Sequence, residues 1–407
     1  VKTVLIQMSI QTSVSERQIS LTSKSKGSGN DDAISVLELA CGKGGDFFKI
    51  QNACSSSHCR LQYVGIDIAD QSLNEFVTRL LENEQKSKKR RRQHWKQQGG
   101  RIPVSSSFDE IRLCCANLGT DHLYSPDSTT TSSSSQQQHL STWNHTTKQW
   151  SLSESAFQKH ENFDVVTMQF ALHYMCQSQK RLIQFFQSWS SHLKEGGLFI
   201  ATTMDANVVR EHVSRYCKND PSFCAKTGNN GAGGHDVIIE DSFGRVSCKM
   251  SFDSETFNLL HGEQENQQSD DKNDNYNDND PFSWDKSLGI RYEMILTEYS
   301  NNGSNDNDDN QGYNFVEAPE WVVPMTTLVD IARAYGDLHL VPEESCNFHD
   351  FYHLKKRKDE YKFLLRKMKV LQDDGYEDDD NVFSRIEWDL AHLYRTLVFR
   401  KGKRQQS

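Results

Sequence analysis

The chain has 407 residues, of which 35% are hydrophobic, enough for a sizeable core and one or two domains. No apolar run approaches the roughly 20 residues of a membrane helix, and the ten cysteines form no Cys-x-x-Cys pair, which favours reduced intracellular thiols. The net charge of −10 is unevenly spread. Residues 262–283, 300–311 and 373–380 carry −6, −3 and −6, so the remainder carries +5 and suits a polyanionic partner weakly.

The first predicted elements are a helix beginning within residues 1–10, a Ser/Gly-rich linker over 20–32 and a buried strand over 34–39. A glycine-rich turn follows the strand, and a helix then runs to about Ile50. Gly42, Gly44 and Gly45 permit positive φ angles and a close approach of a ligand to the backbone. This order of elements is typical of a nucleotide-like cofactor held at the carboxyl end of a first parallel strand.

Two cofactors use such a turn. A dinucleotide fold requires Gly-x-Gly-x-x-Gly, which fits here only if Ala40 replaces the first glycine. A turn that binds S-adenosylmethionine usually has an acid two residues before a Gly-x-Gly-x-Gly motif. Glu38 stands in that place, two residues before Ala40 at the first glycine position.

The second predicted strand, 61–67, ends in Asp67, about twenty residues after the glycines. Either cofactor needs an acid there, because a carboxylate accepts both ribose hydroxyls; a helix-capping role fits Asp70 better. An amphipathic helix is predicted over 72–89 and runs into a basic cluster from Lys86 to Arg92. That cluster is typical of a solvated helix end, a nuclear-import signal or a patch for an RNA backbone.

Further strands are predicted at 111–115, 163–169 and 198–203, with a helix over 178–193 that Gly196 and Gly197 follow. The alternation of strands and helices predicts a doubly wound parallel sheet. Residues 119–160 lack periodicity and are predicted to be an insert. Residues 213–235 are expected to form a loop, 245–252 and 290–298 an antiparallel pair, 321–335 and 351–371 helices, and 394–399 the last strand.

Three motifs carry a family resemblance: residues 37–46 (LELACGKGGD), 65–70 (GIDIAD) and 169–174 (QFALHY). With residues 193–203, Pro319-Glu320-Trp321, Phe351-Tyr352 and Glu387-Trp388, the chain resembles the mRNA cap guanine-N7 methyltransferases from residue 2 to about 400. The resemblance implies one α/β domain over 1–401: a Rossmann-like, seven-stranded class I methyltransferase sheet with helices on both faces. It leaves long polar inserts at 119–160, 262–283 and 300–311 and a tail at 402–407.

The resemblance also implies methyl transfer from S-adenosylmethionine to N7 of the guanosine cap of mRNA, with S-adenosylhomocysteine as product. Carried over by position, the predicted cofactor-binding residues are Lys2, Ala40, Gly42, Asp67, Asn117, Gln169 and Tyr174. The residues predicted to hold the cap and its phosphates are Lys43, Lys49, Arg79, His173 and Tyr394, and those predicted to align methyl donor and acceptor are His173 and Tyr174.

Four positions depart from the family pattern. Ala40 replaces a glycine, Asn117 an acid near the adenine, and Met204 a proline. The family carries a cap-binding acid shortly after a Phe-Gly pair, but Phe243-Gly244 is followed by Arg245 and Val246. The carboxylate for the cap therefore has no assigned position in the sequence.

The chemistry agrees with the residues present. N7 of guanine carries a free lone pair, so in-line transfer needs no general base, and no persuasive nucleophile–base pair is visible. Alignment of donor and acceptor can supply roughly 7–11 kcal/mol of the barrier. No cluster with metal-ligand spacing is present, so no metal is expected.

Three alternatives are weighed against cap methylation: a methyltransferase acting on another acceptor, a dinucleotide oxidoreductase, and a non-catalytic relative that binds cap or RNA. The expected partner is 5′-capped RNA, together with other capping or transcription machinery. We expect a monomer in the nucleus, with no membrane association.

Overall fold

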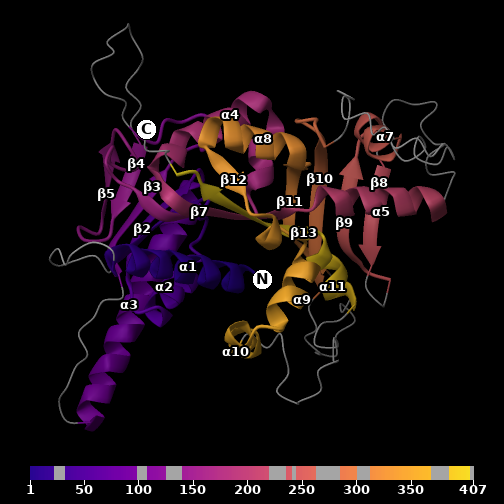
Figure 1. The fold of residues 1–407 in the computed structure, drawn as a ribbon. Coiled ribbons are helices and arrows are strands. Elements are labelled where there is room, and N and C mark those ends of the chain that lie inside the picture. The colour runs from indigo at the N-terminus through magenta and orange to yellow at the C-terminus, as the bar shows by residue number, and fades with distance from the viewer. Residues whose placement is uncertain are drawn as a thin grey trace, which may run out of the picture.

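The computed structural model of the chain describes residues 1–22, 33–98, 108–124, 140–219, 235–240, 244–262, 285–299, 312–367 and 385–403. These residues build two β-sheets (Figure 1). The larger has nine strands in the order β12-β13-β7-β6-β1-β2-β3-β4-β5. Their bounds are β1 Ala33–Leu39, β2 Arg60–Asp67, β3 Phe108–Cys115, β4 Leu140–Asn144, β5 Gln149–Ser153, β6 Phe163–Gln169, β7 Leu193–Met204, β12 Leu338–Leu340 and β13 Tyr394–Lys401.

The centre of the larger sheet is parallel. β1 pairs in parallel with β2 and β6, β2 with β3, and β6 with β7, while β13 runs antiparallel between β7 and β12. Every residue of β1 and β6 is buried, as expected of parallel strands covered on both faces. The predicted Rossmann-like fold is confirmed. The carboxyl ends of β1, β2 and β6 meet at one edge of the sheet, where such folds bind their ligands.

Helices cover both faces of this sheet (Figure 1). On one face α1, α2 and α3 pack through apolar side chains such as Leu5, Phe47 and Phe76. On the other face α4 and α8 pack through Phe185 and Leu328. The helices are α1 Lys2–Thr22, α2 Phe47–Ser56, α3 Asp70–Gln98, α4 Gln179–Trp189, α5 Ala206–Asn219, α7 Ser254–Gly262, α8 Met325–Gly336, α9 Phe348–Lys356, α10 Asp359–Lys367 and α11 Arg385–His392, with a 3₁₀ turn, η1, at Leu172–Gln177.

The smaller sheet is antiparallel, in the order β11-β10-β9-β8. It is formed by β8 His235–Glu240, β9 Val246–Phe252, β10 Arg291–Tyr299 and β11 Gly312–Trp321. The predicted antiparallel pairing of 245–252 with 290–298 is confirmed by the register of β9 and β10. Val209 of α5 and Phe257 of α7 share a separate apolar cluster with this sheet. The molecule thus has a second packed unit beside the cofactor edge of the larger sheet.

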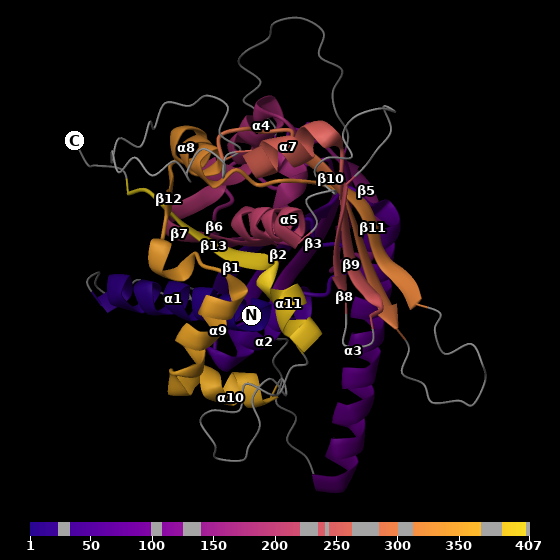
Figure 2. The ribbon, with the colours of Figure 1, turned by 90° about the vertical axis from the view of Figure 1, so that its right-hand side faces the viewer.

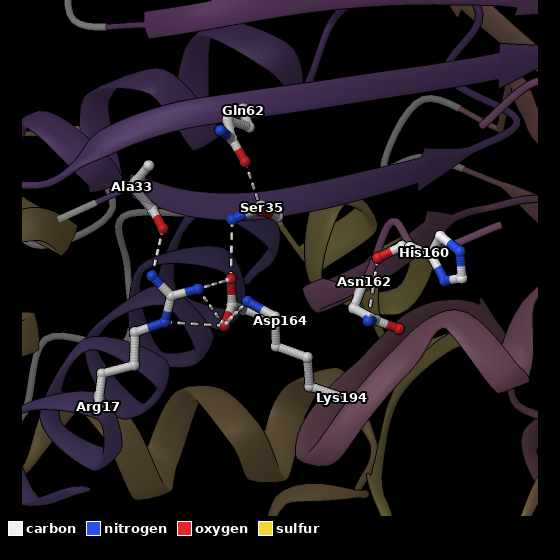
Figure 3. A network of polar contacts seen from close by, with 8 residues as sticks. All are labelled: Arg17, Ala33, Ser35, Gln62, His160, Asn162, Asp164 and Lys194. Carbon is white, nitrogen blue, oxygen red and sulfur yellow. Dashed lines mark hydrogen bonds and ion pairs between the residues drawn. The ribbon is translucent and has the colours of Figure 1, made fainter. Parts of the chain in front are cut away.

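A buried carboxylate joins α1 to the middle of the larger sheet (Figure 3). Asp164 of β6 accepts hydrogen bonds from both Nε and Nη2 of Arg17, at 3.0 and 2.8 Å, from Nζ of Lys194 at 2.9 Å, and from the backbone N of Ser35 at 2.8 Å. Arg17 also donates to the carbonyl oxygen of Ala33. Two cations and one amide on a single buried carboxylate satisfy its acceptor sites. This network holds α1, and with it Lys2, in register with the sheet.

The structure corrects the prediction of an insert over 119–160. Residues 140–153 form the β4–β5 hairpin, which adds two strands beside β3. The hairpin shows little hydrophobic periodicity in its sequence. Leu140 and Trp143 are the buried residues of β4, and the facing strand β5 is mostly polar. The larger sheet therefore has nine strands, two more than the seven predicted.

Four other element predictions change. The single helix predicted over 351–371 is divided into α9 and α10. The expected loop over 213–235 begins inside α5, which continues to Asn219, and ends at the start of β8. The helix predicted from Trp321 begins only at Met325, because Trp321 ends β11 and Pro324 occupies the N-cap position. The helix predicted to run to Leu193 ends as an α-helix at Trp189, and β7 begins at Leu193.

Of the predicted inserts, 300–311 and all of 262–283 except Gly262, which ends α7, lie outside the described part of the chain. The predicted tail 402–407 lies outside it beyond residue 403. Among the described residues, no helix is long and apolar enough to cross a membrane.

Candidate functional site

The glycine turn after β1 has the shape of a ligand-binding loop. The backbone N of Gly42 donates a 2.7 Å hydrogen bond to Oδ2 of Asp67, at the end of the neighbouring strand β2. Gly44 has φ +71°, and a Cβ there would lie 2.3 Å from the ring of Phe76. Ala40 has φ 56°, a left-handed conformation that favours glycine. The backbone thus has the conformation of a glycine loop, with one methyl group in a position suited to glycine.

Asp67 is buried beneath this loop. Its Oδ1 accepts a 2.8 Å hydrogen bond from the backbone N of Ala69, and its Oδ2 accepts from Gly42. An ionised carboxylate offers about four acceptor sites, so two remain for hydroxyl donors. The position at the carboxyl end of β2 and this spare capacity fit the predicted binding of ribose hydroxyls.

Gln169, at the end of β6, lies in the same edge of the sheet. Its Nε2 donates to Oγ1 of Thr167 at 2.9 Å, and its Oε1 accepts from Oγ1 of Thr202 at 3.1 Å. These bonds fix the orientation of the amide. Asn117, which follows β3, accepts from Nη2 of Arg181 at 3.1 Å. Both predicted cofactor residues therefore have fixed rotamers before any ligand arrives.

A three-membered ion cluster connects the start of α1 to the start of α2. Asp46 lies between Lys2 and Lys49: Oδ2 accepts from Nζ of Lys2 at 2.8 Å, and Oδ1 accepts from Nζ of Lys49. The two lysines outweigh the burial of Asp46 and lower the pKa of its carboxyl. Nζ of Lys2 also lies 4.5 Å from the ring centroid of Phe170, which follows β6. The sequence predicted both lysines as contacts but gave no role to Asp46 or Phe170.

His173 lies in the buried turn after β6, beside a carboxylate from the second sheet. Its Nε2 is 3.6 Å from Oε1 of Glu320, and neither ring nitrogen has a hydrogen-bond partner among the described residues. Burial lowers the pKa of His173 to about 3, so the imidazole is neutral. Burial raises the pKa of Glu320 to about 6, partly offset by the hydroxyl of Tyr292, which donates to Oε2 at 2.8 Å.

The pair formed by His173 and Glu320 therefore offers polar atoms toward a shared space. Two buried ring nitrogens without partners are costly unless a ligand satisfies them. Oε1 of Glu320 keeps acceptor capacity, because the Tyr292 bond goes to Oε2. The arrangement can bind a planar molecule that presents adjacent donors and an acceptor.

Aromatic rings surround this pair. The ring of Tyr174 lies 4.2 Å from that of His173 and 6.3 Å from that of Trp321, centroid to centroid. Tyr394, at the start of β13, packs edge-on against Phe170 at 4.8 Å. Burial raises the pKa of both tyrosines, so their hydroxyls stay protonated donors at neutral pH. Phe170 has φ 58°, and this strained backbone aims its ring between Lys2 and Tyr394.

The two remaining predicted cap contacts lie at the rim. Lys43 is exposed and pairs with Glu75 at 2.8 Å. Nη1 of Arg79, on α3, donates to the carbonyl oxygen of Lys43 at 2.7 Å. The two cations are therefore neighbours beside the glycine turn. Among the described residues, no group of three or more His, Cys, Asp or Glu side chains is placed to hold a metal ion.

Glu320 is a candidate site residue to which the sequence assigned no role. The family pattern places a cap-binding acid shortly after a Phe-Gly pair, but here Gly244 only precedes β9 in the second sheet. The sequence signal for Glu320 is Pro319-Glu320-Trp321, a family match without an assigned role. A glutamate in a strand next to Pro and Trp was visible, but only the fold places it opposite His173.

The comparisons with known proteins agree with this geometry. The model of the mRNA (guanine-N(7))-methyltransferase domain matches residues 18–102, 124–229 and 309–402, well over half of the chain. The chain belongs to this family. The predicted family, fold class, function and enzyme class are thereby confirmed at the level of the family. The protein is an S-adenosylmethionine-dependent methyltransferase of the mRNA cap.

Curated relatives give the same answer. An mRNA cap guanine-N(7) methyltransferase 1 from Oryza sativa is 28% identical over 90% of this chain and 68% of its own length. The corresponding protein from Arabidopsis thaliana is 25% identical over 91% of this chain and 69% of its own length. A Drosophila melanogaster mRNA cap guanine-N(7) methyltransferase is 24% identical over 91% of this chain and 65% of its own length.

Solved structures resemble the cap methyltransferase only distantly. An S-adenosylmethionine-dependent methyltransferase from Clostridium acetobutylicum covers 97% of this chain and 92% of its own, at 12% identity and a TM-score of 0.36. That likeness is too low to bear on function.

Proposed function

We propose that this methyltransferase carries out cap methylation by direct in-line transfer, with the residues described above in defined roles. The N7 lone pair of the cap guanine forms a bond to the methyl carbon while the carbon–sulfur bond breaks. The sulfonium becomes the neutral thioether of S-adenosylhomocysteine, and the positive charge moves to the guanine ring. No proton is transferred, so neither a general base nor a metal is required.

The chain supplies the cofactor site through its own fixed groups. S-adenosylmethionine, when bound, provides the activated methyl group. Asp67 accepts the ribose hydroxyls with its two spare acceptor sites, and the small residues Ala40 and Gly42 leave the backbone open to the ligand. Lys2 and Gln169 contact the methionine part, and Asn117 lies toward the adenine. The prearranged Gln169 and Asn117 amides support this assignment, because little entropy is lost when they bind.

The observation that carries the cap assignment is the pairing of His173 with Glu320. Guanine presents the N1 and N2 donors beside the O6 acceptor on one edge. Glu320 accepts from the two donors, and the neutral His173 donates from its one protonated ring nitrogen to O6. That bond satisfies one of the two ring nitrogens that have no partner among the described residues. The charge of Glu320 also stabilises the positive charge that develops on guanine during transfer. Tyr174 and Tyr394 provide the aromatic walls.

Lys43, Lys49 and Arg79 then form the rim that binds the triphosphate bridge. Each is a cation at or near the glycine turn, and Lys43 and Arg79 are held together by a backbone contact. The protein acts as a monomer in the nucleus, where it meets other capping or transcription machinery. The capped RNA substrate and the basic run at 86–92 support this location. The non-catalytic alternative rested on a missing carboxylate, which Glu320 supplies.

Radiolabelled methyl transfer tests the proposal. The purified protein is incubated with labelled S-adenosylmethionine and two matched RNAs, one with an unmethylated guanosine cap and the other with a plain triphosphate. Label on the capped RNA alone, released by nuclease as 7-methylguanosine, is the expected result. Label at another position, or equal label on both RNAs, contradicts the assigned acceptor.

A further inference from the structure

A second cavity lies next to the proposed cap site. It has a volume of about 330 Å³ and is enclosed by the first turn of α1 together with α2, α9, α10 and α11. Figure 2 shows the N-terminal end of α1 beside α9 and α11. Aromatic side chains form part of its wall, with Phe348, Tyr352 and Trp388 among the lining residues. This volume lies within the usual range for small-ligand sites, about 300–1,000 Å³.

A buried lysine lines this cavity. Lys355 is only 5% exposed, and its Nζ donates to the thioether sulfur of Met8 at 3.0 Å. The ammonium also faces the rings of Phe351 and Tyr361, at 5.2 and 5.5 Å from their centroids. Among the described residues, no carboxylate oxygen lies within 4.0 Å of it; Glu344 and Glu360 act only over longer distances.

Such an ammonium is poorly compensated. A thioether is a weak acceptor, and a buried charge normally has a carboxylate or several strong acceptors as partners. Burial accordingly lowers the pKa of Lys355. A buried cation that faces a ligand-sized space and lacks a close anion is the arrangement expected before an anionic ligand binds.

The cavity borders the proposed cap site and shares residues with it. Lys2 and Lys49 line it and also hold Asp46. The ring of Phe348 lies 6.2 Å from that of Phe170 and 5.9 Å from that of Tyr394. The cavity therefore lies beside Lys49, one of the residues proposed to bind the phosphates.

We propose that the cavity receives the first transcribed nucleotide of the capped RNA, with its base against the aromatic wall and its phosphate at Lys355. This inference rests on the proposed function and extends it from the cap to the RNA body. Aromatic side chains stack on any base without sequence preference, and lysines bind the backbone. The described lining residues include aromatic rings and three lysines but no carboxylate, which favours a nucleotide over an acidic peptide that would need backbone partners as well.

Substrate comparison with Lys355→Met tests the proposal. Methionine keeps the length and the apolar stem but removes the charge. KM is measured for GpppApG and for GTP, which carries guanosine and a triphosphate but no downstream nucleotide. We expect the KM of the wild type to be lower for GpppApG than for GTP. In K355M, the ratio of the KM for GTP to the KM for GpppApG should be at least fivefold smaller than in the wild type. The exposed Lys358→Met is the matched control and should leave the ratio unchanged.

An unaltered ratio in a folded K355M overturns the proposal and leaves the cavity to another occupant, such as an acidic peptide. Absence of methylation of both substrates by the wild type contradicts the proposed function instead. Photocrosslinking the wild-type protein covers the case in which K355M does not fold. A capped RNA with 4-thiouridine at its first transcribed position should crosslink to peptides containing residues 348–355 or Trp388. A crosslink confined to other segments refutes the assignment.

Discussion

Replacing Glu320 by Gln tests the guanine-binding role most directly. The amide keeps the size of the side chain, but it has one acceptor where the carboxylate has two, and its NH₂ group opposes a guanine donor. Loss of one hydrogen bond to a charged group costs about 1.5–3 kcal/mol. At about 1.4 kcal/mol per tenfold, kcat/KM for GpppG-capped RNA should fall roughly 10- to 100-fold, while the Kd for S-adenosylhomocysteine changes little.

The pH profile gives an independent readout. Burial raises the pKa of Glu320 to about 6, so the carboxylate gains a proton and loses its charge as the pH falls through 6. A protonated Glu320 cannot accept two donors, and kcat/KM of the wild type should therefore decline below pH 6, where it reports ionisation of the free enzyme. E320Q carries no ionisable group at this position and should lack that limb.

The matched control is Glu317→Gln, an exposed residue on the same strand, β11. It should retain the wild-type kcat/KM and pH profile. If E320Q also keeps both, Glu320 does not bind the guanine and the cap site has been placed wrongly. If E320Q loses affinity for S-adenosylhomocysteine to the same extent as for RNA, the substitution has damaged the fold of the site as a whole.

Five further substitutions test other parts of the structure. His173→Ala and Tyr174→Ala should each lower kcat/KM by about 100-fold through loss of alignment, with a much smaller change in cofactor Kd by calorimetry; equal losses would remove their assigned role. Asp164→Asn removes the carboxylate charge that Arg17 and Lys194 share and should cost about 2–4 kcal/mol in urea unfolding; a cost under about 0.5 kcal/mol would show that the network is dispensable. Burial and the charge of Asp46 raise the pKa of Glu38 to about 8, so its stabilising contribution is present at low pH and is lost as the pH rises from about 4.5 to 8. Glu38→Gln keeps an acceptor for Tyr63 and should raise stability by about 1.4 kcal/mol or more at pH 8.5 but little at pH 5; a difference that does not vary with pH would contradict this. Ala40→Gly relieves a left-handed φ worth about 1–2 kcal/mol but adds chain entropy worth about 0.5–1 kcal/mol, so a small gain in thermal stability is expected and a clear loss would show that the methyl group contributes packing.

The parallel half of the fold could be predicted from the sequence because its signals are local. Strand β1, the glycine turn and Asp67 lie within a short stretch in which apolar runs and glycines mark each boundary. The β4–β5 hairpin and β12 could not be predicted in the same way. The hairpin is mainly polar, and β12 has only three residues, Leu338–Leu340, so neither carries a periodic pattern long enough to recognise.

The site was predictable only where the family motifs reached. Lys2 and Lys49 were expected at the site, but the carboxylate that holds them both, Asp46, was not given a role. Glu320 lies 147 positions after His173 in a different sheet, and no local pattern connects the two. Contacts of this kind depend on how β11 meets the turn after β6, which is a property of tertiary packing.

This division of the site between two sheets has a functional consequence. The proposed cofactor residues Asp67 and Gln169 belong to the nine-stranded sheet, whereas Glu320 and Tyr292 belong to the four-stranded one. The two units have largely separate apolar clusters and meet at His173 and Tyr394. Substitutions inside the second sheet should therefore weaken cap binding before cofactor binding. The alignment of methyl donor with acceptor then depends on the packing between the sheets, which is where a partner protein or the RNA body could change the rate without touching either ligand.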